Sequence, residues 1–472
     1  MHRKAPPLTT STELTSLSLA EAADLVSRRE VSSVDLTDAC IERAERLEPA
    51  LHTYITRTFE TARSEAKAAQ EASAAGRYLG PLHGVPFAIK DLYETAGVRT
   101  TAGSKPRESH VPAEDAEAVA RLKAAGIVML GKLNLHEWAM GGTNVNVFYP
   151  TPRNPWDTSR ITGGSSGGSG AALAARTCYG SLGTDTRGSI RIPASLCGIT
   201  GIKATYGRVS IRGVIPLSWS LDHAGPMART ARDCALILSA IAGFDPQDPT
   251  TVDLPVPDYA AALDGSARGL RVGVARNFFF DEGACEPEIR ASVHAAADVL
   301  RDLGATVSEV EVPGPLEYAA SGAFFADSLA YHEAALRDDP ARFSEPILKR
   351  LNGPPFSGVD YSRDRYRQLE LKRGLELLFR EIDLLLTPTS CIPPLKIDEA
   401  PAWAPGAILA RNTSPFNVAG LPTISLPCGF DSQGLPIGMQ LTGRWWDEAT
   451  VLRAADAYQR VTDWHTREPS LG

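Results

Sequence analysis

The 472-residue sequence predicts an α/β fold, a single large domain with a mixed, mostly parallel central sheet that helices cover on both faces. Three observations predict it. Segments with helical periodicity alternate with short apolar segments along most of the chain. Hydrophobic residues make up 43% of the sequence and charged residues 22%, which is the balance of a globular protein with a large core. No internal repeat or low-complexity linker divides the chain, so we expect one domain over residues 1–472.

The N-terminal part of the chain is predicted to be mainly helical up to the first buried strand. Ser18 and Glu21 have the spacing of a capping box, which opens a short helix. The next helix carries an apolar stripe and is expected to end at Pro49, because proline has no amide hydrogen to continue a helix. An alanine-rich helix follows it. Residues 85–89 are short, apolar and partly β-branched, so they are predicted to form a buried strand that ends beside Lys90.

The rest of the chain continues the alternation of helices and strands. A helix over residues 114–125 is stopped by Gly126, and a strand follows at once. Residues 313–360 are rich in proline, glycine, aromatic and charged residues, which is typical either of a variable cap near an active site or of ordinary surface loops and short helices. The other expected helices span residues 230–242, 288–303, 363–382 and about 448–459, and the expected strands span residues 127–130, 384–386, 423–426 and 437–441.

The net charge and the cysteines argue against several classes of protein. The formal net charge is −8, which argues against a broad phosphate-binding surface and so against nucleic acid as the main partner. The seven scattered cysteines include no Cys-x-x-Cys pair, and His83 and His136 have no metal-ligand spacing, so neither a metal nor a cofactor is expected. No apolar signal core follows the N-terminus, and no apolar run approaches the roughly 18 residues of a membrane span. We therefore expect a cytoplasmic protein with reduced cysteines, either monomeric or homodimeric.

Two clusters of glycine and serine lie close together, at residues 163–169 and 183–191. Their glycines allow backbone N–H groups to approach a reacting carbonyl oxygen, which favours acyl-transfer chemistry. Phosphate binding does not fit, because Ser169 stands where the Walker motif needs lysine and the dinucleotide pattern is absent. Ser166 and Ser169 also have a purely structural interpretation, as caps of the helix that follows.

Residues 163–167 also satisfy the Gly-x-Ser-x-Gly pattern of the α/β-hydrolase nucleophile elbow. That elbow requires a strand immediately before it, whereas residues 156–160 are polar and turn-like. Its histidine comes late in the chain, which leaves only His332 or His465 for the role. We therefore do not expect a Ser-His-Asp triad at this site.

The ordered motifs of the chain resemble those of the amidase signature family. The likeness is dense over residues 82–230, which we take as the signature core, and it returns at residues 385–389 and 417–422. It therefore covers most of the chain and implies the amidase signature fold. The motifs that carry it in the core are Lys90, the two glycine and serine clusters, and residues 193–203.

The resemblance implies a Ser-cisSer-Lys catalytic set. Carried onto this sequence, Ser189 is the nucleophile, Ser165 is a bridging serine with a cis peptide bond, and Lys90 is the base. A lysine can act as a base only when it is neutral, so its pKa must fall from about 10.4 to about 7. The apolar segment before Lys90 supplies the burial that favours the neutral form.

The resemblance also implies roles for the loop that bears the nucleophile. Asp185 and Arg191 are expected to hold this loop through charged hydrogen bonds rather than to take part in bond making. The chain departs from many relatives at residue 187, where they have glycine. Arg187 either points outward, or its cation shapes the pocket and steers the substrate. The backbone N–H groups that are expected to stabilise the oxyanion are those of Thr186, Arg187, Gly188 and Ser189.

The function that the resemblance implies is hydrolysis of the C–N bond of small-molecule amides or carbamates, including aryl amides and urethanes, through an acyl-enzyme on Ser189. An alternative is the glutaminase component of glutamyl-tRNA amidotransferase, its A subunit, which releases ammonia from glutamine for a partner enzyme. Arg187 weakens this alternative, as does Ile192 at a position where that subunit tends to carry glutamine. A non-enzymatic binding protein on the same scaffold is a third hypothesis, against which the joint presence of Lys90, Ser165 and Ser189 argues.

Overall fold

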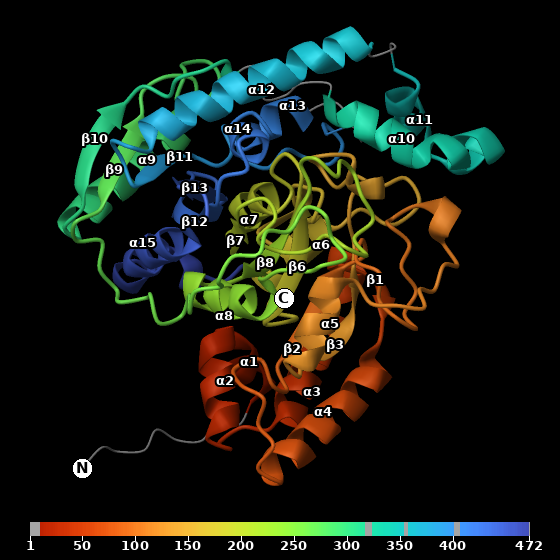
Figure 1. The fold of residues 1–472 in the computed structure, drawn as a ribbon. Helices are drawn as coiled ribbons and strands as arrows, with labels where there is room; N and C mark the ends of the chain where they lie inside the picture. Colours follow the sequence, from red (N-terminus) through yellow and green to blue (C-terminus); the bar gives the residue numbers. More distant parts are fainter. Residues whose placement is uncertain (1–9, 317–322, 354–356, 401–405, 472) are drawn as a thin grey trace.

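An eleven-stranded mixed sheet runs through the computed structural model, which describes residues 10–316, 323–353, 357–400 and 406–471 (Figure 1). The strands are β1 (Tyr54–Arg57), β2 (Pro86–Lys90), β3 (Val128–Leu133), β6 (Gly180–Asp185), β7 (Thr200–Lys203), β8 (His223–Ala228), β9 (Arg271–Ala275), β10 (Thr306–Val310), β11 (Leu384–Pro388), β12 (Thr423–Phe430) and β13 (Pro436–Gly443). Their order across the sheet is β1-β3-β2-β6-β8-β7-β12-β13-β11-β9-β10.

The sheet confirms the α/β class, with parallel pairs grouped on either side of an antiparallel centre. The parallel groups are β3-β2-β6 and β11-β9-β10. Within the described residues six of the ten pairs in this sheet are antiparallel, so parallel pairs are fewer than expected. The connections explain the difference. For example, β12 returns to β13 through the short turn at residues 431–435, and such a turn makes an antiparallel pair without a crossover helix.

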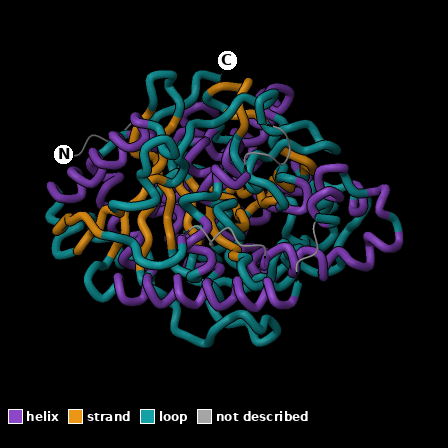
Figure 2. The backbone as a smooth tube through the Cα atoms, turned by 90° about the horizontal axis from the view of Figure 1, so that it is seen from above, coloured by secondary structure: helices purple, strands orange, loops and turns teal. Residues whose placement is uncertain are grey.

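Helices cover both faces of this sheet, as Figure 2 shows from above. On one face α6 (Gly167–Ala174) packs against α7 (Arg191–Cys197). On the other face α8 (Ala231–Ile241), α15 (Glu448–Val461) and α9 (Pro287–Asp302) lie side by side. The buried apolar side chains of the strands and of these helices form one continuous main core, so the chain folds as a single domain around one sheet.

The first predicted helix is confirmed, whereas the end of the second is corrected. Ser18 caps α2 (Leu19–Ser27), because its Oγ accepts the Glu21 N–H while the Glu21 carboxylate accepts the Ser18 N–H at 2.7 Å. The following helix runs through Pro49, so the predicted stop there is wrong. This proline lies in the last turn, where it removes only one backbone hydrogen bond. The helix ends instead at His52, which has a φ of 53° and donates its N–H to the Glu48 carbonyl.

The remaining helices complete the cover of the sheet and extend beyond it. They are α1 (Ser11–Ser16), α2 (Leu19–Ser27), α3 (Ser33–Leu51), α4 (Phe59–Ala74), α5 (Glu117–Ala124), α10 (Ala323–Asp338), α11 (Glu345–Leu351), α12 (Gly358–Leu378), α13 (Gly406–Leu409) and α14 (Ser414–Val418). No helix in the described parts of the chain is both long enough and apolar enough to cross a membrane. All seven cysteines are buried and free of disulfide bonds.

The polar segment before the first glycine and serine cluster forms a strand, which corrects the prediction of a turn. β5 (Asp157–Ile161) pairs with β4 (Arg153–Asn154) in a separate two-stranded sheet. Its polar composition reflects exposure, because Thr158 and Ser159 face solvent while the strand backbone bonds to residues 395–397. A strand therefore does precede the Gly-x-Ser-x-Gly pattern, and the contacts of its serine must decide the nucleophile-elbow hypothesis.

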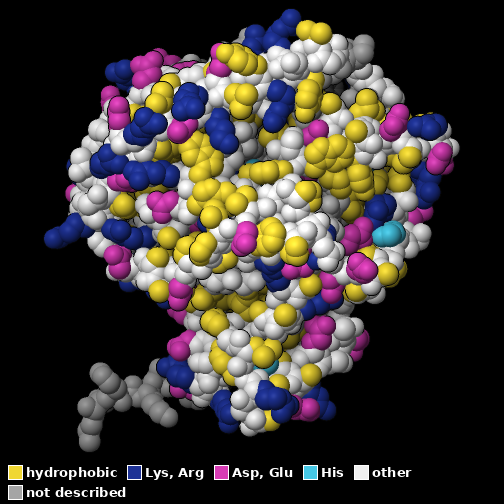
Figure 3. Space-filling model, in the orientation of Figure 1, with side chains coloured by type: hydrophobic (Ala, Val, Ile, Leu, Met, Phe, Trp, Pro, Cys, Tyr) yellow, Lys and Arg dark blue, Asp and Glu magenta, His cyan; other side chains and the backbone are white. Residues whose placement is uncertain are grey.

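The segment predicted as a cap contains α10 and α11, which lie beside the start of α12 (Figure 1). Phe324, Phe343 and Ile347 are buried, so the described part of this segment packs firmly onto the protein. Residues 317–322 and 354–356 of the predicted cap lie outside the described residues. Figure 3 shows Lys and Arg side chains gathered over the region of α12, with hydrophobic side chains exposed between them. Helices α10 and α11 therefore form a layer of their own beyond the central sheet.

The close approach of β1 and β3 depends on Gly131. This glycine has a φ of 149°, and an added Cβ would lie 2.3 Å from the Thr56 carbonyl oxygen. We expect Gly131→Ala to lower the free energy of unfolding by about 3 kcal/mol, measured by urea titration. Gly434→Ala is the control, because Gly434 also has a positive φ but no atom lies within 4 Å of the added Cβ. Gly434→Ala should lower the free energy of unfolding by only about 1 kcal/mol. Equal losses in the two variants would contradict the steric explanation.

Candidate active site

Lys90 is the last residue of β2, a strand enclosed by β3 and β6 in the interior of the sheet. The four residues before it are buried, and the lysine itself is fully buried. Burial disfavours the charged amine and lowers the pKa of Lys90 to about 7, although the carboxylates of Asp222 and Asp185 act in the opposite direction. The amine of Lys90 is therefore mostly uncharged at a pH just above 7.

Three hydroxyl groups surround the amine of Lys90. Its Nζ lies 2.8 Å from Ser165 Oγ, 2.9 Å from Ser166 Oγ and 2.6 Å from Thr184 Oγ1. Of these partners Ser165 was predicted from the sequence, whereas Ser166 and Thr184 were missed. The helix-cap interpretation of Ser166 is wrong, because its side chain makes no capping hydrogen bond to α6. Ser169 does not cap the helix either, and its buried Oγ has no hydrogen-bond partner within the described residues.

The loop before α6 presents Ser165 to the lysine. The peptide bond between Gly164 and Ser165 is cis, as the family resemblance implies. The Ser165 carbonyl accepts the His136 N–H at 3.1 Å, and the next residue along, Ser166, donates its N–H to the Ser189 carbonyl at 3.3 Å. This last bond ties the first glycine and serine cluster directly to the second.

Ser189 lies on the loop between β6 and α7 and opens onto a cavity whose empty space, including the part open to solvent, is about 420 Å³. It is 8% exposed, whereas Ser165 and Lys90 are fully buried. Thr186 and Arg187 of the same loop also line this cavity. Ser189 is therefore the member of the predicted catalytic set that a small molecule in the cavity can reach.

Asp185 organises the Ser189 loop from inside the protein. Its carboxylate accepts the backbone N–H groups of Gly188 at 2.6 Å and of Ile190 at 3.2 Å. It also forms a buried ion pair with Arg191, with the guanidinium Nε at 3.0 Å. Burial alone would raise the pKa of Asp185, but the attraction of Arg191 outweighs it and holds the pKa below its usual range.

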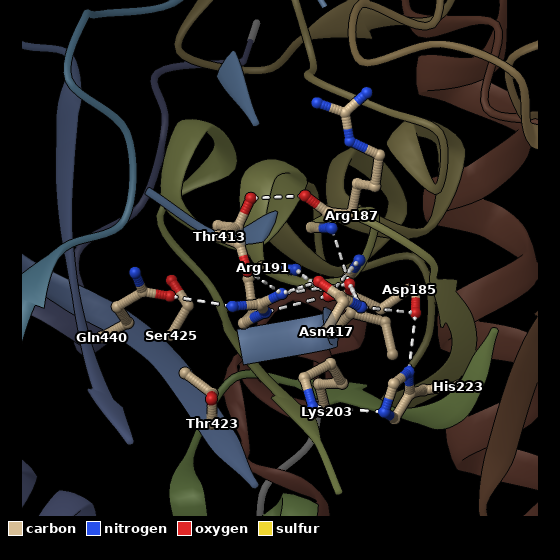
Figure 4. A network of polar contacts seen from close by, with 12 residues as sticks. Asp185, Arg187, Arg191, Lys203, His223, Thr413, Asn417, Thr423, Ser425 and Gln440 are labelled. Atoms are coloured by element: carbon tan, nitrogen blue, oxygen red, sulfur yellow. Dashed lines mark hydrogen bonds and ion pairs between the residues drawn. The ribbon is translucent and has the colours of Figure 1, made fainter. Parts of the chain in front are cut away.

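Arg191 extends this network to the other half of the sheet (Figure 4). Its guanidinium donates to Asn417 Oδ1 at 2.6 Å, to Gln440 Oε1 at 3.0 Å and to the Thr413 carbonyl at 3.0 Å. Asn417 in turn donates to the Asp185 carboxylate at 2.8 Å. The fully buried charge is thus surrounded by acceptors, and it anchors the loop to residues more than two hundred positions later in the chain.

The backbone of Gly188 corrects one part of the predicted oxyanion site. Its N–H donates to Asp185 and so turns away from the cavity, which removes it from the expected set of oxyanion donors. Its glycine is nevertheless required, because φ is 131° and an added Cβ would lie 2.2 Å from Thr413 Oγ1. Thr413 also donates its hydroxyl to the Arg187 carbonyl at 2.5 Å. The predicted donors that remain belong to Thr186, Arg187 and Ser189.

Two further residues close to the site, Asp222 and His223, were not predicted from the sequence. The Thr186 hydroxyl donates to the Asp222 carboxylate at 2.5 Å, and burial raises the pKa of Asp222 to about 6. His223 contacts the Asp185 carbonyl at 3.1 Å through Nδ1 and the Lys203 amine at 3.3 Å through Nε2 (Figure 4). Asp222 and His223 adjoin no glycine or serine cluster in the sequence, so only the fold brings them to the loop.

The side chain of Arg187 lines the cavity, so the expectation of an outward-pointing arginine is wrong. Its Nε donates to Ser414 Oγ at 3.1 Å, and its guanidinium lies 5.3 Å from the centre of the Phe324 ring. Figure 4 shows it directed away from the network of Asp185 and Arg191. Arg187 does not adopt a positive φ, so its backbone accommodates a side chain without strain.

The histidines are not placed to serve a rival mechanism. Ser165 Oγ contacts the Lys90 amine, which removes the basis of the nucleophile-elbow hypothesis. His332 packs against the ring of Trp138, with centres 4.7 Å apart, as a structural residue would. His136 is buried, and burial together with the charges of Arg350 and Lys90 lowers its pKa to about 3. No group of three or more His, Cys, Asp or Glu within the described residues could hold a metal ion.

A family model described as Amidase matches residues 35–452, which include every residue of this site. The chain belongs to the amidase signature family. This membership confirms the resemblance found in the sequence, and it supports an enzyme that acts on the C–N bond of amides.

Two relatives and one solved structure illustrate the range of this family. The A subunit of glutamyl-tRNA(Gln) amidotransferase from Roseiflexus sp. (strain RS-1) is 45% identical, over 98% of this chain and 99% of its own. A Pseudomonas putida protein named Amidase is 43% identical, over 97% of this chain and 98% of its own. The structure of 6-aminohexanoate cyclic dimer hydrolase is similar with a TM-score of 0.87 at 29% identity, over 97% of this chain and 99% of that chain. The amidase fold therefore extends over nearly the whole chain.

The buried ion pair predicts a large effect of Arg191→Met. This variant leaves the Asp185 carboxylate buried without its partner, so we expect the free energy of unfolding to fall by about 3–5 kcal/mol in urea titration. Arg276→Met is the matched control, since Arg276 pairs with Glu311 on the surface and both side chains are more than 60% exposed. Its effect should stay within about 0.5 kcal/mol. A small effect of Arg191→Met would show that the network does not hold the loop.

Proposed function

We propose that this chain is a serine hydrolase that cleaves the C–N bond of amides or carbamates through an acyl-enzyme on Ser189. The observation that carries the proposal is the contact between the buried, readily neutral amine of Lys90 and the hydroxyl of Ser165, beside the loop that bears Ser189. Such a chain of groups can move a proton from a serine hydroxyl to an amine without a histidine.

The surroundings of Lys90 aim its lone pair. A neutral amine has two N–H groups and one lone pair. The hydroxyl oxygens of Ser166 and Thr184 lie where they can accept the two N–H groups, which leaves the lone pair for the Ser165 hydroxyl. Lys90 then takes the proton of Ser165 while Ser165 takes that of Ser189, whose oxygen attacks the carbonyl carbon.

The oxyanion that forms requires fixed N–H donors close to Ser189. In the proposal they are backbone N–H groups of Thr186, Arg187 and Ser189, held in place because Asp185 fixes the loop from behind. When the tetrahedral intermediate collapses, the protonated Lys90 returns a proton through Ser165 to the leaving nitrogen. Water then repeats the attack on the acyl-enzyme and releases the acid.

Carbamates and aryl amides offer the same carbonyl group bonded to nitrogen, so the mechanism extends to them without a new catalytic group. The apolar part of the cavity lining, which includes Ile192, Leu217 and Phe324, supports binding of such substrates. A relative named Amidase and a similar structure named 6-aminohexanoate cyclic dimer hydrolase also support a hydrolase function.

A second candidate is release of ammonia from glutamine as one component of an amidotransferase, which the 45% identical relative favours. The two functions share the chemistry on Ser189 and differ in their partner. Arg187 and Ile192, two positions at which the chain departs from that component, both line the cavity beside Ser189. This placement supports a hydrolase that acts without a partner protein.

The catalytic set is tested by single substitutions. We expect Ser189→Ala, Ser165→Ala and Lys90→Met each to lower kcat/KM for an active amide by at least about 10³-fold, because each interrupts the proton path. A fluorophosphonate should label Ser189 in the folded wild-type protein. Ser169→Ala is the control, since its buried Oγ makes no hydrogen bond to any described residue, and it should retain labelling and most activity. Unchanged turnover in Ser189→Ala would overturn the proposed mechanism.

The pH dependence of kcat/KM should follow Lys90. The base must be neutral and its pKa is about 7, so activity should rise with pH through about 7 and fall about tenfold per unit below it. The carboxylate of Asp222 raises the pKa of Lys90. Asp222→Asn removes that charge, so it should move the rising limb to lower pH. A limb that stays in place in this variant would contradict the assignment to Lys90.

The two candidate functions are separated by a panel of substrates given to the purified chain alone. We expect turnover of aliphatic amides, anilides or carbamates without any partner protein. Glutamine is the comparison, supplied with and without tRNA and the B component of an amidotransferase. Turnover confined to glutamine in the presence of these partners would favour the amidotransferase function instead.

A further inference from the structure

The cavity beside Ser189 carries a positive charge that the proposed mechanism does not use. Two cationic side chains, Arg187 and Arg350, line it, and no acidic side chain is among its lining residues. Arg187 comes from the loop of the nucleophile, and Arg350 comes from α11. The two segments are far apart in the sequence, so the fold itself brings both guanidinium groups to one cavity.

Within the described residues, no carboxylate balances the charge of either arginine. Arg187 donates Nε to Ser414 Oγ, but its buried Nη2 has no hydrogen-bond partner within the described residues. Arg350 donates Nη1 to the Met140 carbonyl, and its guanidinium lies 5.5 Å from the Phe325 ring centre. Neither forms an ion pair with Asp or Glu in the described part of the chain, in contrast to the buried pair of Arg191.

The arrangement has an electrostatic cost that an anion would relieve. Burial and the neighbouring charge of Arg350 lower the pKa of Arg187 to about 10, and burial lowers the pKa of Arg350. Both groups therefore stay protonated at neutral pH while they repel each other. A buried guanidinium N–H without an acceptor adds to this cost, and a carboxylate can accept two N–H groups of one guanidinium at once.

We propose that the cavity binds amides that also carry a carboxylate, and that Arg187 and Arg350 hold this carboxylate while the scissile carbonyl lies at Ser189. The inference rests on the proposed function, because it places the reacting group at that serine. The other lining residues are uncharged, which leaves the two arginines as the charged recognition groups. Arg187 and Arg350 are then specificity residues, which select the substrate without taking part in bond making.

Binding to Ser189→Ala tests this proposal without depending on turnover. Calorimetry would compare N-(4-nitrophenyl)succinamate with 4-methyl-N-(4-nitrophenyl)pentanamide, in which an isopropyl group replaces the carboxylate. A second pair, 4-acetamidobenzoate and 4-isopropylacetanilide, places the charge on the amine side. We expect the acid to bind at least about tenfold more tightly than its neutral partner in one of the pairs. No preference for the acid in either pair would overturn the proposal.

Arginine variants in the same background identify the groups responsible. Arg350→Met and Arg187→Gly should each reduce the preference for the acid, and the double variant should abolish it. Arg342→Met is the matched control, because Arg342 is exposed in the same segment and is not among the lining residues of the cavity, so the preference should persist. A preference that survives the double variant would also overturn the proposal.

The outcomes separate this inference from the proposed function. If Ser189→Ala abolishes turnover while acids and neutral amides bind equally, the hydrolase mechanism stands and the carboxylate site falls. If the acids bind preferentially while turnover survives in Ser189→Ala, the carboxylate site stands and the mechanism falls. The comparison of acid and neutral ligands in Ser189→Ala keeps both arginines, so it tests the proposal even if an arginine variant fails to fold.

Discussion

The buried pair of Asp185 and Arg191 is the interaction on which the site depends. Removing two charges from water is costly. Here the cost is offset because the carboxylate and the guanidinium each form hydrogen bonds to other buried groups. The aspartate holds the Ser189 loop, and the arginine reaches Asn417 and Gln440 in the distant part of the sheet. The Ser189 loop is therefore held by the packing of the whole domain and not by its own short sequence.

A second constraint acts on Lys90, because the proposed mechanism requires a neutral amine and therefore a buried one. Its place at the end of an interior strand supplies this burial, and the three hydroxyl groups around it satisfy the amine without restoring its charge. A carboxylate in direct contact would have kept the lysine protonated. Asp222 and Asp185 act on it only from a distance, which leaves its pKa near the pH at which it must work.

Local sequence signals predicted most of the elements, the resemblance to the family pointed to Lys90, Ser165 and Ser189, and tertiary placement decided the rest. The capping box at Ser18 and the apolar run before Lys90 are short-range patterns, so they could be recognised directly. The stop predicted at Pro49 failed because the last turn of a helix tolerates proline. The roles of Thr184 and Asp222 and the inward direction of Arg187 depend on segments that meet only in the folded chain.

Several segments form the wall of the cavity, and two of them belong to different layers of the protein. The Ser189 loop supplies Ser189 and Arg187, while the layer formed by α10 and α11 supplies Phe324 and Arg350. Natural variation or protein engineering can therefore alter that outer layer and change which compounds the cavity accepts, while Ser189 and its loop stay in place. Arg350 is an exception, because it donates a hydrogen bond to the Met140 carbonyl. A change at Arg350 therefore also affects Met140, which lines the cavity from another segment.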